Sequence, residues 1–556
     1  MPPLMGFDEV RRYHENHHAD QVAAARARPV VKIWDKNHGV NPGKTQYLPV
    51  AEVFGEIDGD FEEILNDTGP GSLNLYASHP LRDWLIDEVA EAEDVHVTVD
   101  LPGWRWHGKA LTITEVQDED GIEYVRIAFQ HGFEHSKKII CFSNPFLPAI
   151  AQAPKHWNWA GNSITAIHAL MFCNLWRRYA PGWQLPDDIF APGGPQGWLA
   201  NLNPSNWPQI VLPPLTDDTS MWCIITTRFG NFHDVIKGVL EDAGLMLQCT
   251  QWLPGDPQPR PSHFTLTKPT LLWECVDVSG VRGPFGNTLD GLLKLTSSLT
   301  EDFLEEVVTA SDWGDAPAQY SSPTFFGTIR DFPWVVWRNS MRRDRVRGSG
   351  ESGIRSWHMT IHKALAGAVV TGGRSPAWLN ASVKLLLNAG LGYLGALIGN
   401  PGLALGIFDK QVEDVLLAFQ RVAFSLRQAI MGRSSYGEHW EQGTGEGFSL
   451  STLSTIRLGR WNTRAYTSFK IKVVNMAPFW IGRHIGLGGR AAGEIGRSGR
   501  LYVDTIHSVR LTWSRTKDPD FELALGTDKE EEAPTSRLGR LVEKVKAGLQ
   551  IFGVDM

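Results

Sequence analysis

The sequence predicts a multidomain α+β protein with antiparallel β-barrel or sandwich domains at both ends. A mixed α/β insertion and an apolar helical segment are expected between them. The length of 556 residues indicates roughly three or four domains, because one hydrophobic core rarely serves so long a chain. Apolar and polar residues alternate near both ends, as they do in strands. In the middle of the chain, apolar residues recur at the spacing of helices.

Residues 1–27 are expected to form an N-terminal helical arm, since a polar, alanine-rich stretch ends before Pro29. Residues 28–150 are predicted to be the first β-rich domain. Residues 95–100 and 122–127 are its clearest strands, because apolar and polar side chains alternate along both. Turn-forming residues separate these runs, which is typical of an antiparallel barrel or sandwich.

Residues 151–330 are predicted to be a mixed α/β domain. Its first helix begins after Asn162 or Ser163, since either is a suitable N-cap. The residues at helical spacing in it are Ile164, Ile167, His168, Met171 and Leu175. A second helix ends near Gly244 and is followed by a strand over residues 245–249. Its apolar residues are Phe232, Val235, Ile236, Val239 and Leu240.

Residues 331–375 are predicted to connect this domain to an apolar helical segment over residues 376–432. One helix face is expected from Val412, Val415, Leu416, Phe419, Val422, Ala423, Leu426 and Ile430. Residues 385–408 carry no charged side chain, and as a helix of about 36 Å they would be long enough to cross a bilayer. We expect instead a buried helical hairpin that bends at residues 400–402, where Asn, Pro and Gly follow one another. Transient membrane contact through residues 385–408 is the open alternative.

Residues 433–530 are predicted to be the second β-rich domain, with its clearest strands at residues 501–503 and 509–513. Residues 531–556 are expected to form a linker and a C-terminal amphipathic helix. The apolar stripe of that helix contains Leu538, Leu541, Val542, Val545 and Leu549. A single helix of this length is marginal in water, so we expect it to dock on a neighbouring protein.

Composition excludes several classes of protein. The formal net charge of −9 argues against specific nucleic-acid binding, and the basic run at residues 342–347 is short and interrupted by Asp344. Five cysteines without a Cys-x-x-Cys pair do not form a disulfide framework, and residues 1–12 contain no apolar secretory segment. We therefore expect folding in a reducing cytoplasm. The 22 tryptophans favour protein interfaces, with sugar stacking as the alternative.

His14-Glu15-Asn16-His17-His18 matches the H-E-x-x-H pattern of zinc proteases. The match lies on a helix that is polar on every side, with no third ligand in view, so nothing would bury a metal ion. We predict that this motif has no catalytic role.

Three further patterns also fail. Gly43-Lys44-Thr45 lacks the first glycine of a phosphate-binding loop, and Pro49 prevents the helix that should follow. Residues 486–491 resemble a dinucleotide-binding loop, but later glycines interrupt any following helix. Residues 438–441, Glu-His-Trp-Glu, place two carboxylates near an imidazole, which we interpret as a charged turn. We predict no catalytic, cofactor-binding or metal-binding residue and no cofactor.

Short segments spread over nearly the whole chain carry a joint resemblance. They are residues 29–35 (PVVKIWD), 95–108 (VHVTVDLPGWRWHG), 133–137 (FEHSK), 144–148 (NPFLP), 242–246 (DAGLM), 371–376 (TGGRSP), 430–432 (IMG) before Glu438, and 500–504 (RLYVD). Their order and spacing resemble the minor tail protein family of siphoviruses that infect mycobacteria and related actinobacteria. The glycine-rich residues 485–500 depart from the family pattern, which leaves the role of that loop open.

The resemblance to tail hubs implies a homotrimer at the tail tip of the virion, assembled in the host cytoplasm. Such a hub closes the tail tube and contacts the distal tail protein ring, the tape measure protein and other minor tail proteins. The segments at 28–142 and 448–526 would supply two barrel domains per subunit, giving six around the axis. No catalytic motif comes with the resemblance, so we expect a structural protein and not an enzyme. A tail-associated cell-wall hydrolase and a glycan-binding adhesin are the alternatives.

Overall fold

The structure is a computed structural model. It describes residues 15–20, 22–24, 27–34, 49–89, 91, 93–117, 119, 121–147, 149–180, 202–213, 217–259, 265–295, 327–331, 333–338, 353–372, 419–441, 459–460, 463, 465–476, 479–494 and 501–525. The chain divides into two compact units. The first contains residues 1–358, 469–527 and 544–556, and the second contains residues 359–468 and 528–543.

The largest element of the described residues is a 13-stranded sheet with the order β18-β22-β25-β24-β3-β4-β7-β6-β5-β1-β2, to which β23 and β17 are attached beside β24. Its strands from the N-terminal part are β1 (Val30–Trp34), β2 (Pro49–Val53), β3 (Asp58–Ile64), β4 (Pro70–Tyr76), β5 (His96–Leu101), β6 (Trp104–Gln117) and β7 (Glu123–His131). The others are β17 (Val336–Trp337), β18 (Ile354–His362), β22 (Tyr466–Val473), β23 (Arg490–Glu494), β24 (Leu501–Ser514) and β25 (Lys517–Leu525).

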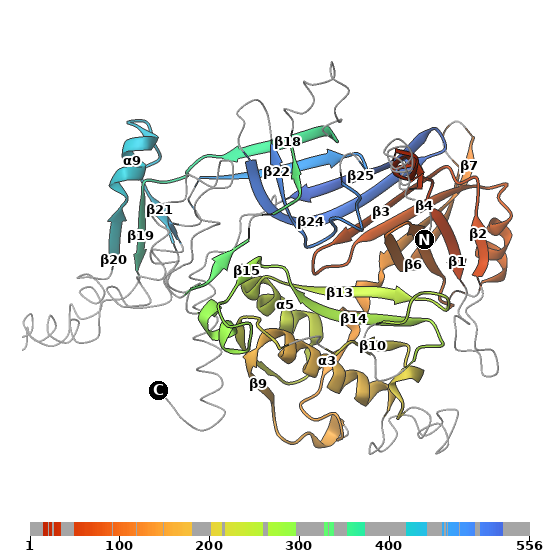
Figure 1. Cartoon of the computed structure of the whole chain (residues 1–556), viewed down its shortest axis with the longest axis horizontal. Coiled ribbons are helices and arrows are strands. Elements are labelled where there is room, and N and C mark those ends of the chain that lie inside the picture. The colour runs from red at the N-terminus through yellow and green to blue at the C-terminus, as the bar shows by residue number, and fades with distance from the viewer. Residues whose placement is uncertain are drawn as a thin grey trace, which may run out of the picture. The chain divides into compact units, whose positions relative to one another are not determined.

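Strands β3 and β24 join the two ends of the chain. They pair antiparallel, from Asp58 opposite Ser514 to Ile64 opposite Ser508, and Figure 1 shows them side by side in orange-red and blue. The first and the last β-rich segments are predicted from the sequence to be separate domains, whereas their strands lie in one sheet. The barrel or sandwich form of these domains and the domain boundaries remain predictions.

Aromatic side chains pack at this junction. The ring of Phe61 on β3 stacks on that of Trp513 on β24, with centroids 5.5 Å apart, and meets the edge of Trp106 on β6 at 4.9 Å. All three side chains are fully buried. Gly59 allows this packing, because a Cβ atom there would lie 2.3 Å from the Trp513 ring. Burial of each large side chain contributes about 1.5–3 kcal/mol, so this cluster holds the joined sheet together.

An α/β layer follows β7 in the chain. Its strands are β8 (Ile140–Cys141), β9 (Trp157–Asn162), β10 (Gln209–Val211), β11 (Trp222–Thr227), β12 (Gly230–Asn231), β13 (Leu245–Trp252), β14 (Thr270–Asp277), β15 (Val281–Arg282) and β16 (Ile329–Arg330). They pair as β10-β14-β13, β11-β9, β12-β8 and β15-β16. Its helices are α3 (Ser163–Tyr179) and α5 (Phe232–Ala243).

Short helical segments complete the first unit. They are α2 (Leu81–Asp83), the π-helical turn η1 (Trp84–Glu88), and the 3₁₀ turns η2 (Gly132–Lys138), η3 (Ala149–Ala151) and η4 (Pro204–Asn206).

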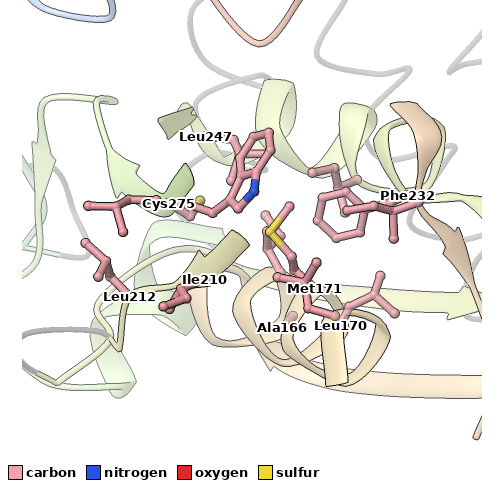
Figure 2. Packing of buried hydrophobic residues seen from close by; sticks show 14 of the residues in the cluster. Ala166, Leu170, Met171, Ile210, Leu212, Phe232, Leu247 and Cys275 are labelled. Carbon is pink, nitrogen blue, oxygen red and sulfur yellow. The ribbon is translucent and has the colours of Figure 1, made fainter. Parts of the chain in front are cut away.

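The core of the α/β layer forms where the two helices meet the three-stranded sheet. Figure 2 shows Met171 of α3, Phe232 of α5 and Leu247 of β13 pointing into one cluster with Ile210 of β10 and Cys275 of β14. Most of its members are less than 4% exposed. The apolar periodicity of both helices therefore marks the faces that are buried here.

The two helices and the strand predicted for this layer are present at their expected positions. Helix α3 has Asn162 as its N-cap residue, and α5 ends at Gly244, which adopts the left-handed conformation with φ 61°. A Cβ atom at Gly244 would lie 2.7 Å from Ser279 Cβ. Glycine is therefore required both by the left-handed conformation and by the lack of space for a side chain. Strands β5 and β7 likewise cover most of the expected runs at residues 95–100 and 122–127.

The second unit contains β19 (Ala368–Gly372), β20 (Phe419–Ala423), α9 (Ser425–Met431) and β21 (His439–Trp440). Strand β19 pairs with β20 and with β21. The helix expected through residues 419–430 is therefore wrong in its described part, because β20 is a strand and α9 begins only at Ser425. Pairing of β20 with β19 outweighs the helical spacing of the apolar residues, because β-branched and aromatic residues are favoured in strands. Ile430, expected on a buried face, is 78% exposed.

Several expectations lie outside the described residues. They concern the basic run 342–347, the segment 385–408 and the C-terminal helix over 536–552. Within the part of the chain that the structure describes, no helix has the length and apolar character needed to cross a membrane.

Candidate functional site

The densest group of polar and titratable side chains lies where the large sheet meets the α/β layer. Asn66 is in the turn after β3 and adopts the left-handed conformation, with φ 55°. Its Nδ2 donates to the carbonyl oxygen of Leu245 at 2.7 Å, and its Oδ1 accepts from the backbone N–H of Leu247 at 2.9 Å. The carbonyl oxygen of Asn66 lies 2.9 Å from Nε2 of the buried His233. One turn residue thus binds the starts of both β13 and α5.

Arg105 on β6 makes a second connection across the same junction. Its guanidinium forms ion pairs with Asp100 of β5 and with Asp256, which lies beyond β13. Nη1 also donates to the carbonyl oxygen of Gln251 at 3.1 Å. Burial disfavours the charged guanidinium, but the hydrogen bonds to Asp256 and Asp100 outweigh this effect and raise the pKa of Arg105. Asp256 accepts the backbone N–H of Leu253 as well, so the ion pair fixes the turn after β13.

A buried cluster of histidine and cysteine lies between these two connections. Nε2 of His107 is 3.5 Å from Sγ of Cys249, and the rings of His107 and His131 have centroids 4.6 Å apart. Nδ1 of His107 and Nε2 of His131 are buried and have no hydrogen-bond partner among the residues that the structure describes. Burial lowers the pKa of His131 to about 3. Burial also lowers the pKa of His107 well below its ordinary value, and neighbouring positive groups lower it further. Both imidazoles are therefore neutral near pH 7.

A cysteine beside a histidine invites comparison with a nucleophilic pair, but the environment opposes it. Burial raises the pKa of Cys249 well above its ordinary value, and the nearby carboxylate of Glu63 acts in the same direction. The thiol therefore stays protonated, whereas a cysteine nucleophile needs a stabilised thiolate. Burial also raises the pKa of Glu63 to about 7, against the hydrogen bond that its Oε2 accepts from Trp104 at 3.0 Å. The cluster fits a structural joint.

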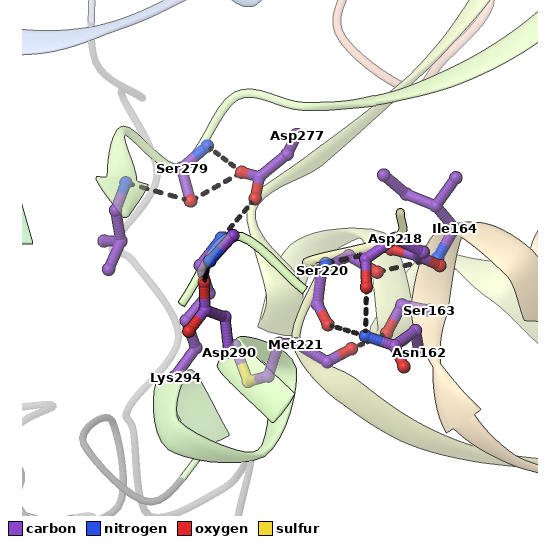
Figure 3. A network of polar contacts seen from close by, with 12 residues as sticks. Asn162, Ser163, Ile164, Asp218, Ser220, Met221, Asp277, Ser279, Asp290 and Lys294 are labelled. Carbon is purple, nitrogen blue, oxygen red and sulfur yellow. Dashed lines mark hydrogen bonds and ion pairs between the residues drawn. The ribbon is translucent and has the colours of Figure 1, made fainter. Parts of the chain in front are cut away.

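A separate polar network holds the beginning of α3 (Figure 3). Asp218 accepts hydrogen bonds from the backbone N–H and hydroxyl of Thr165, at 2.8 and 2.6 Å. Ser220 accepts the N–H of Ile164 at 3.0 Å. Asn162 donates through Nδ2 to the carbonyl oxygens of Asp218 and Ser220. The free N–H groups of this helix end are satisfied by a segment more than 50 positions away, which is a structural role.

Figure 3 also shows a second part of that region. Lys294, whose side chain is nearly buried, lies 2.7 Å from Asp277, which in turn accepts from Ser279. Asp290 is buried and accepts the backbone N–H groups of Phe285 and Gly286. Each charge is therefore used to fix the backbone that leads out of β14.

The motifs singled out in the sequence supply none of the junction residues named above, although Gly488 lies close to Met246 of β13. Glu15, His17 and His18 are exposed on a helical stretch, while His14 lies outside the described residues. Within the described residues, no group of three or more His, Cys, Asp or Glu side chains has the arrangement of a metal site. Residues 490–494 form strand β23, and not the helix that a dinucleotide loop requires.

The Glu-His-Trp-Glu segment lies in the second unit. Nε2 of His439 is 3.2 Å from Oε2 of Glu441, and Glu438 is paired with Arg421. Because Arg421 engages one of the two carboxylates, the segment does not place two free carboxyl groups around a substrate position. Residues 43–45 lie outside the described residues.

Sequence reasoning missed the residues of the junction. Arg105 and His107 lie within the family-like segment 95–108, but that segment assigned them no role, and the pair His107–Cys249 is separated by 142 positions. A local signal exists only for Asn66, because Asn-Asp-Thr-Gly at residues 66–69 is typical of a turn.

The described geometry defines a β-rich α+β protein whose main polar site is a structural joint with no activated nucleophile. A model of the Siphovirus ReqiPepy6 Gp37-like protein family matches residues 30–527. The chain belongs to this family of siphovirus proteins, and the family resemblance expected from the sequence is confirmed.

Individual proteins resemble the chain over most of its length. Minor tail protein Gp28 of Mycobacterium phage L5 is 28% identical over 569 residues, which cover 90% of this chain and 92% of that protein. Minor tail protein Gp28 of Mycobacterium phage D29 is 28% identical over 541 residues, covering 85% and 88%. Among solved structures, the tail protein from Neisseria meningitidis MC58 has a TM-score of 0.37 and 11% identity, covering 91% of this chain and 98% of that one.

Proposed function

We propose that the chain is a structural minor tail protein that forms a trimeric hub at the tip of a long-tailed phage. In this role it closes the tail tube, joins the distal tail ring to the tip proteins, contacts the tape measure protein and helps deliver DNA into the host. It has no enzymatic activity and is assembled in the host cytoplasm before it becomes part of the virion.

The pairing of β3 with β24 is the observation that supports the proposal most. It places strands from residues 49–131 and from residues 466–525 side by side within one subunit. A subunit with two antiparallel strand groups gives six groups when three copies surround an axis. Such a trimer suits a sixfold tail on one side and a threefold tip on the other.

Exposed tryptophans supply contact area for such an assembly. Trp334 is 68% exposed on the first unit, and Trp440 is 51% exposed on the second. Trp is enriched at protein interfaces, since its large, rigid ring buries much area for little loss of conformational freedom. The exposed area of both side chains can be buried by contacts with further copies or with other tail proteins.

The test is the copy number of the chain in solution and in the tail. Light scattering of the purified chain is expected to give about three times its mass of 61.9 kDa. A reconstruction of the tail should place three copies around the axis at the tip. Six copies in one ring, or a single copy on the periphery, would contradict the hub assignment while leaving membership of the family intact.

A further inference from the structure

A compact aromatic and basic patch is exposed on the α/β layer. The short strands β8 and β12 pair there, with Ile140 opposite Asn231. Phe142 follows β8 and Phe229 precedes β12, and their rings meet edge to face with centroids 4.9 Å apart. We call Ile140, Phe142, Phe229 and the two arginines beside them the phenylalanine patch. Ile140 is 41% and Phe229 37% exposed.

The backbone of Phe229 is strained. Its φ is 55°, in the left-handed region that bulky residues avoid, at a cost of about 1–2 kcal/mol. The backbone N–H of Phe229 donates to Cys141 at 2.8 Å, and glycine at this position would make the same bond without strain. Phe229 is 37% exposed, and its ring contact with Phe142 and its backbone hydrogen bond to Cys141 offset part of this cost. A bulky, partly exposed residue in a strained conformation, where glycine would fit, points to a role for the side chain.

Two guanidinium groups flank the rings. Arg177 lies over Phe142, with Cζ 3.9 Å from the ring centroid, and donates to the carbonyl oxygen of Ile140 at 3.3 Å. Arg228 lies 6.0 Å from the centroid of Phe229. Among the described residues, Arg228 forms no ion pair and is exposed. In a chain with a net charge of −9, this patch combines an apolar surface with positive charge.

We propose that the phenylalanine patch is a docking surface for a segment of another tail protein that carries carboxylates beside apolar side chains. The apolar side chains of that segment pack on Phe229 and Ile140, and a carboxylate pairs with Arg228. Arginine and aromatic residues together are typical of the residues that dominate binding at interfaces. The charge of Arg228 favours an acidic segment over a basic one. The inference rests on the chain being a tail component, but not on a trimeric state or a hub position.

The contact is tested in assembled tails with Phe229→p-benzoylphenylalanine, which keeps an aromatic ring and forms a covalent bond to its neighbour on illumination. Mass spectrometry of the product is expected to identify a segment of another tail protein that contains Asp or Glu beside apolar residues. A product between two copies of this chain, a neighbour without acidic residues, or no product in assembled tails would each overturn the proposal.

Two substitutions separate docking from folding. Phe229→Gly removes both the strain and the ring contact with Phe142, two effects of similar size and opposite sign, so it should change the melting temperature of the purified chain little while lowering the yield of complete tails. Arg228→Glu should lower that yield about tenfold or more, and Arg228→Lys much less. Phe285→Ala is the control, because Phe285 is 63% exposed outside the patch, and it should leave the yield unchanged. A Phe229→Gly chain that assembles normally contradicts the inference, and so does an Arg228→Glu chain that assembles normally. Trimer formation by the purified chain is a separate readout, so a failure of the hub proposal remains distinguishable.

Discussion

The side-chain amide of Asn66 donates a 2.7 Å hydrogen bond from Nδ2 to the carbonyl oxygen of Leu245. The two residues are 179 positions apart and belong to the large sheet and to the α/β layer. Because Asn66 also accepts from the N–H of Leu247, one side chain continues the hydrogen bonding at the start of β13. The joint therefore depends on a residue type that tolerates the left-handed conformation and offers both a donor and an acceptor.

Substitutions at Asn66 should separate the two properties. Asn66→Gly keeps the backbone free of strain and loses both side-chain bonds, so we expect a loss of about 1–3 kcal/mol in the free energy of unfolding. Asn66→Ala loses the same bonds and adds left-handed strain of about 1 kcal/mol. Urea denaturation followed by tryptophan fluorescence measures both. Equal stability of the glycine variant and the original chain would show that the joint does not depend on these bonds.

The neutral histidines of the junction should make the protein sensitive to acid. In the folded chain the pKa of His131 is about 3, below its ordinary value of 6.5, because burial disfavours the charged ring. Between these values the unfolded chain binds a proton that the folded chain does not, so stability falls as the pH falls from about 6.5 towards 3. We expect this contribution to lower the melting temperature between pH 7.5 and 5.0, while Glu63 acts in the opposite direction over the same range, so the effect of His131 is read from a variant.

His131→Asn supplies the matched variant for this acid effect. Asparagine offers an acceptor near the place of Nδ1, which accepts from the N–H of Phe133 in the original chain. The variant should be less stable at pH 7.5 and should lose less stability on acidification. An unchanged slope of melting temperature against pH would contradict the role given to His131.

Glu63 should act in the opposite direction. Its folded pKa is about 7 and its ordinary value is 4.5, so the stability it contributes is complete below pH 4.5 and is lost as the pH rises through 7. Glu63→Gln keeps an acceptor for Trp104 and cannot ionise. We expect it to be more stable than the original chain at pH 8.5, by on the order of 1 kcal/mol, and nearly equal at pH 5. The control is Glu62→Gln, on the opposite face of β3; equal effects of both variants would contradict the assignment.

The cap of α3 predicts a further difference between neighbouring residues. Asp218→Ala removes the acceptor of the Thr165 N–H and should cost about 1–2 kcal/mol of unfolding free energy. Asp217→Ala changes the adjacent exposed carboxylate and should cost almost nothing. Denaturant midpoints compare the two. A similar loss for both would mean that the general charge of the segment matters, and not the cap.

The H-E-x-x-H motif should be silent. Glu15 is exposed on a polar helical stretch, so Glu15→Gln is expected to leave phage titre unchanged. The measurement is the titre together with wall degradation by purified tails. Loss of wall-degrading activity in this variant would overturn the proposal that the chain is not an enzyme.

The parts of the fold that the sequence predicted are those with a local signal. Helix α5 has apolar residues at helical spacing, Asn231 as a cap and Gly244 as its end, so its bounds follow from a dozen neighbouring residues. Strand β20 was missed because its neighbour β19 supplies the pairing from about fifty positions away. The candidate site carried still less signal. His107 and Cys249 are identified as a pair only because the fold buries them beside one another, and no spacing in the sequence predicts this.

The pairing of β3 with β24 also has a consequence for how the chain is made. Asp60 and Arg510, which form an ion pair across these strands, are separated by 450 positions. Strand β3 leaves the ribosome early, and its partner is synthesised only near the end of translation. Throughout that interval the nascent protein carries an open sheet edge, with backbone N–H and C=O groups that other chains can pair with. A message that stops short of residue 500 would therefore yield a product prone to aggregation, so incomplete chains would be kept out of growing tails by insolubility.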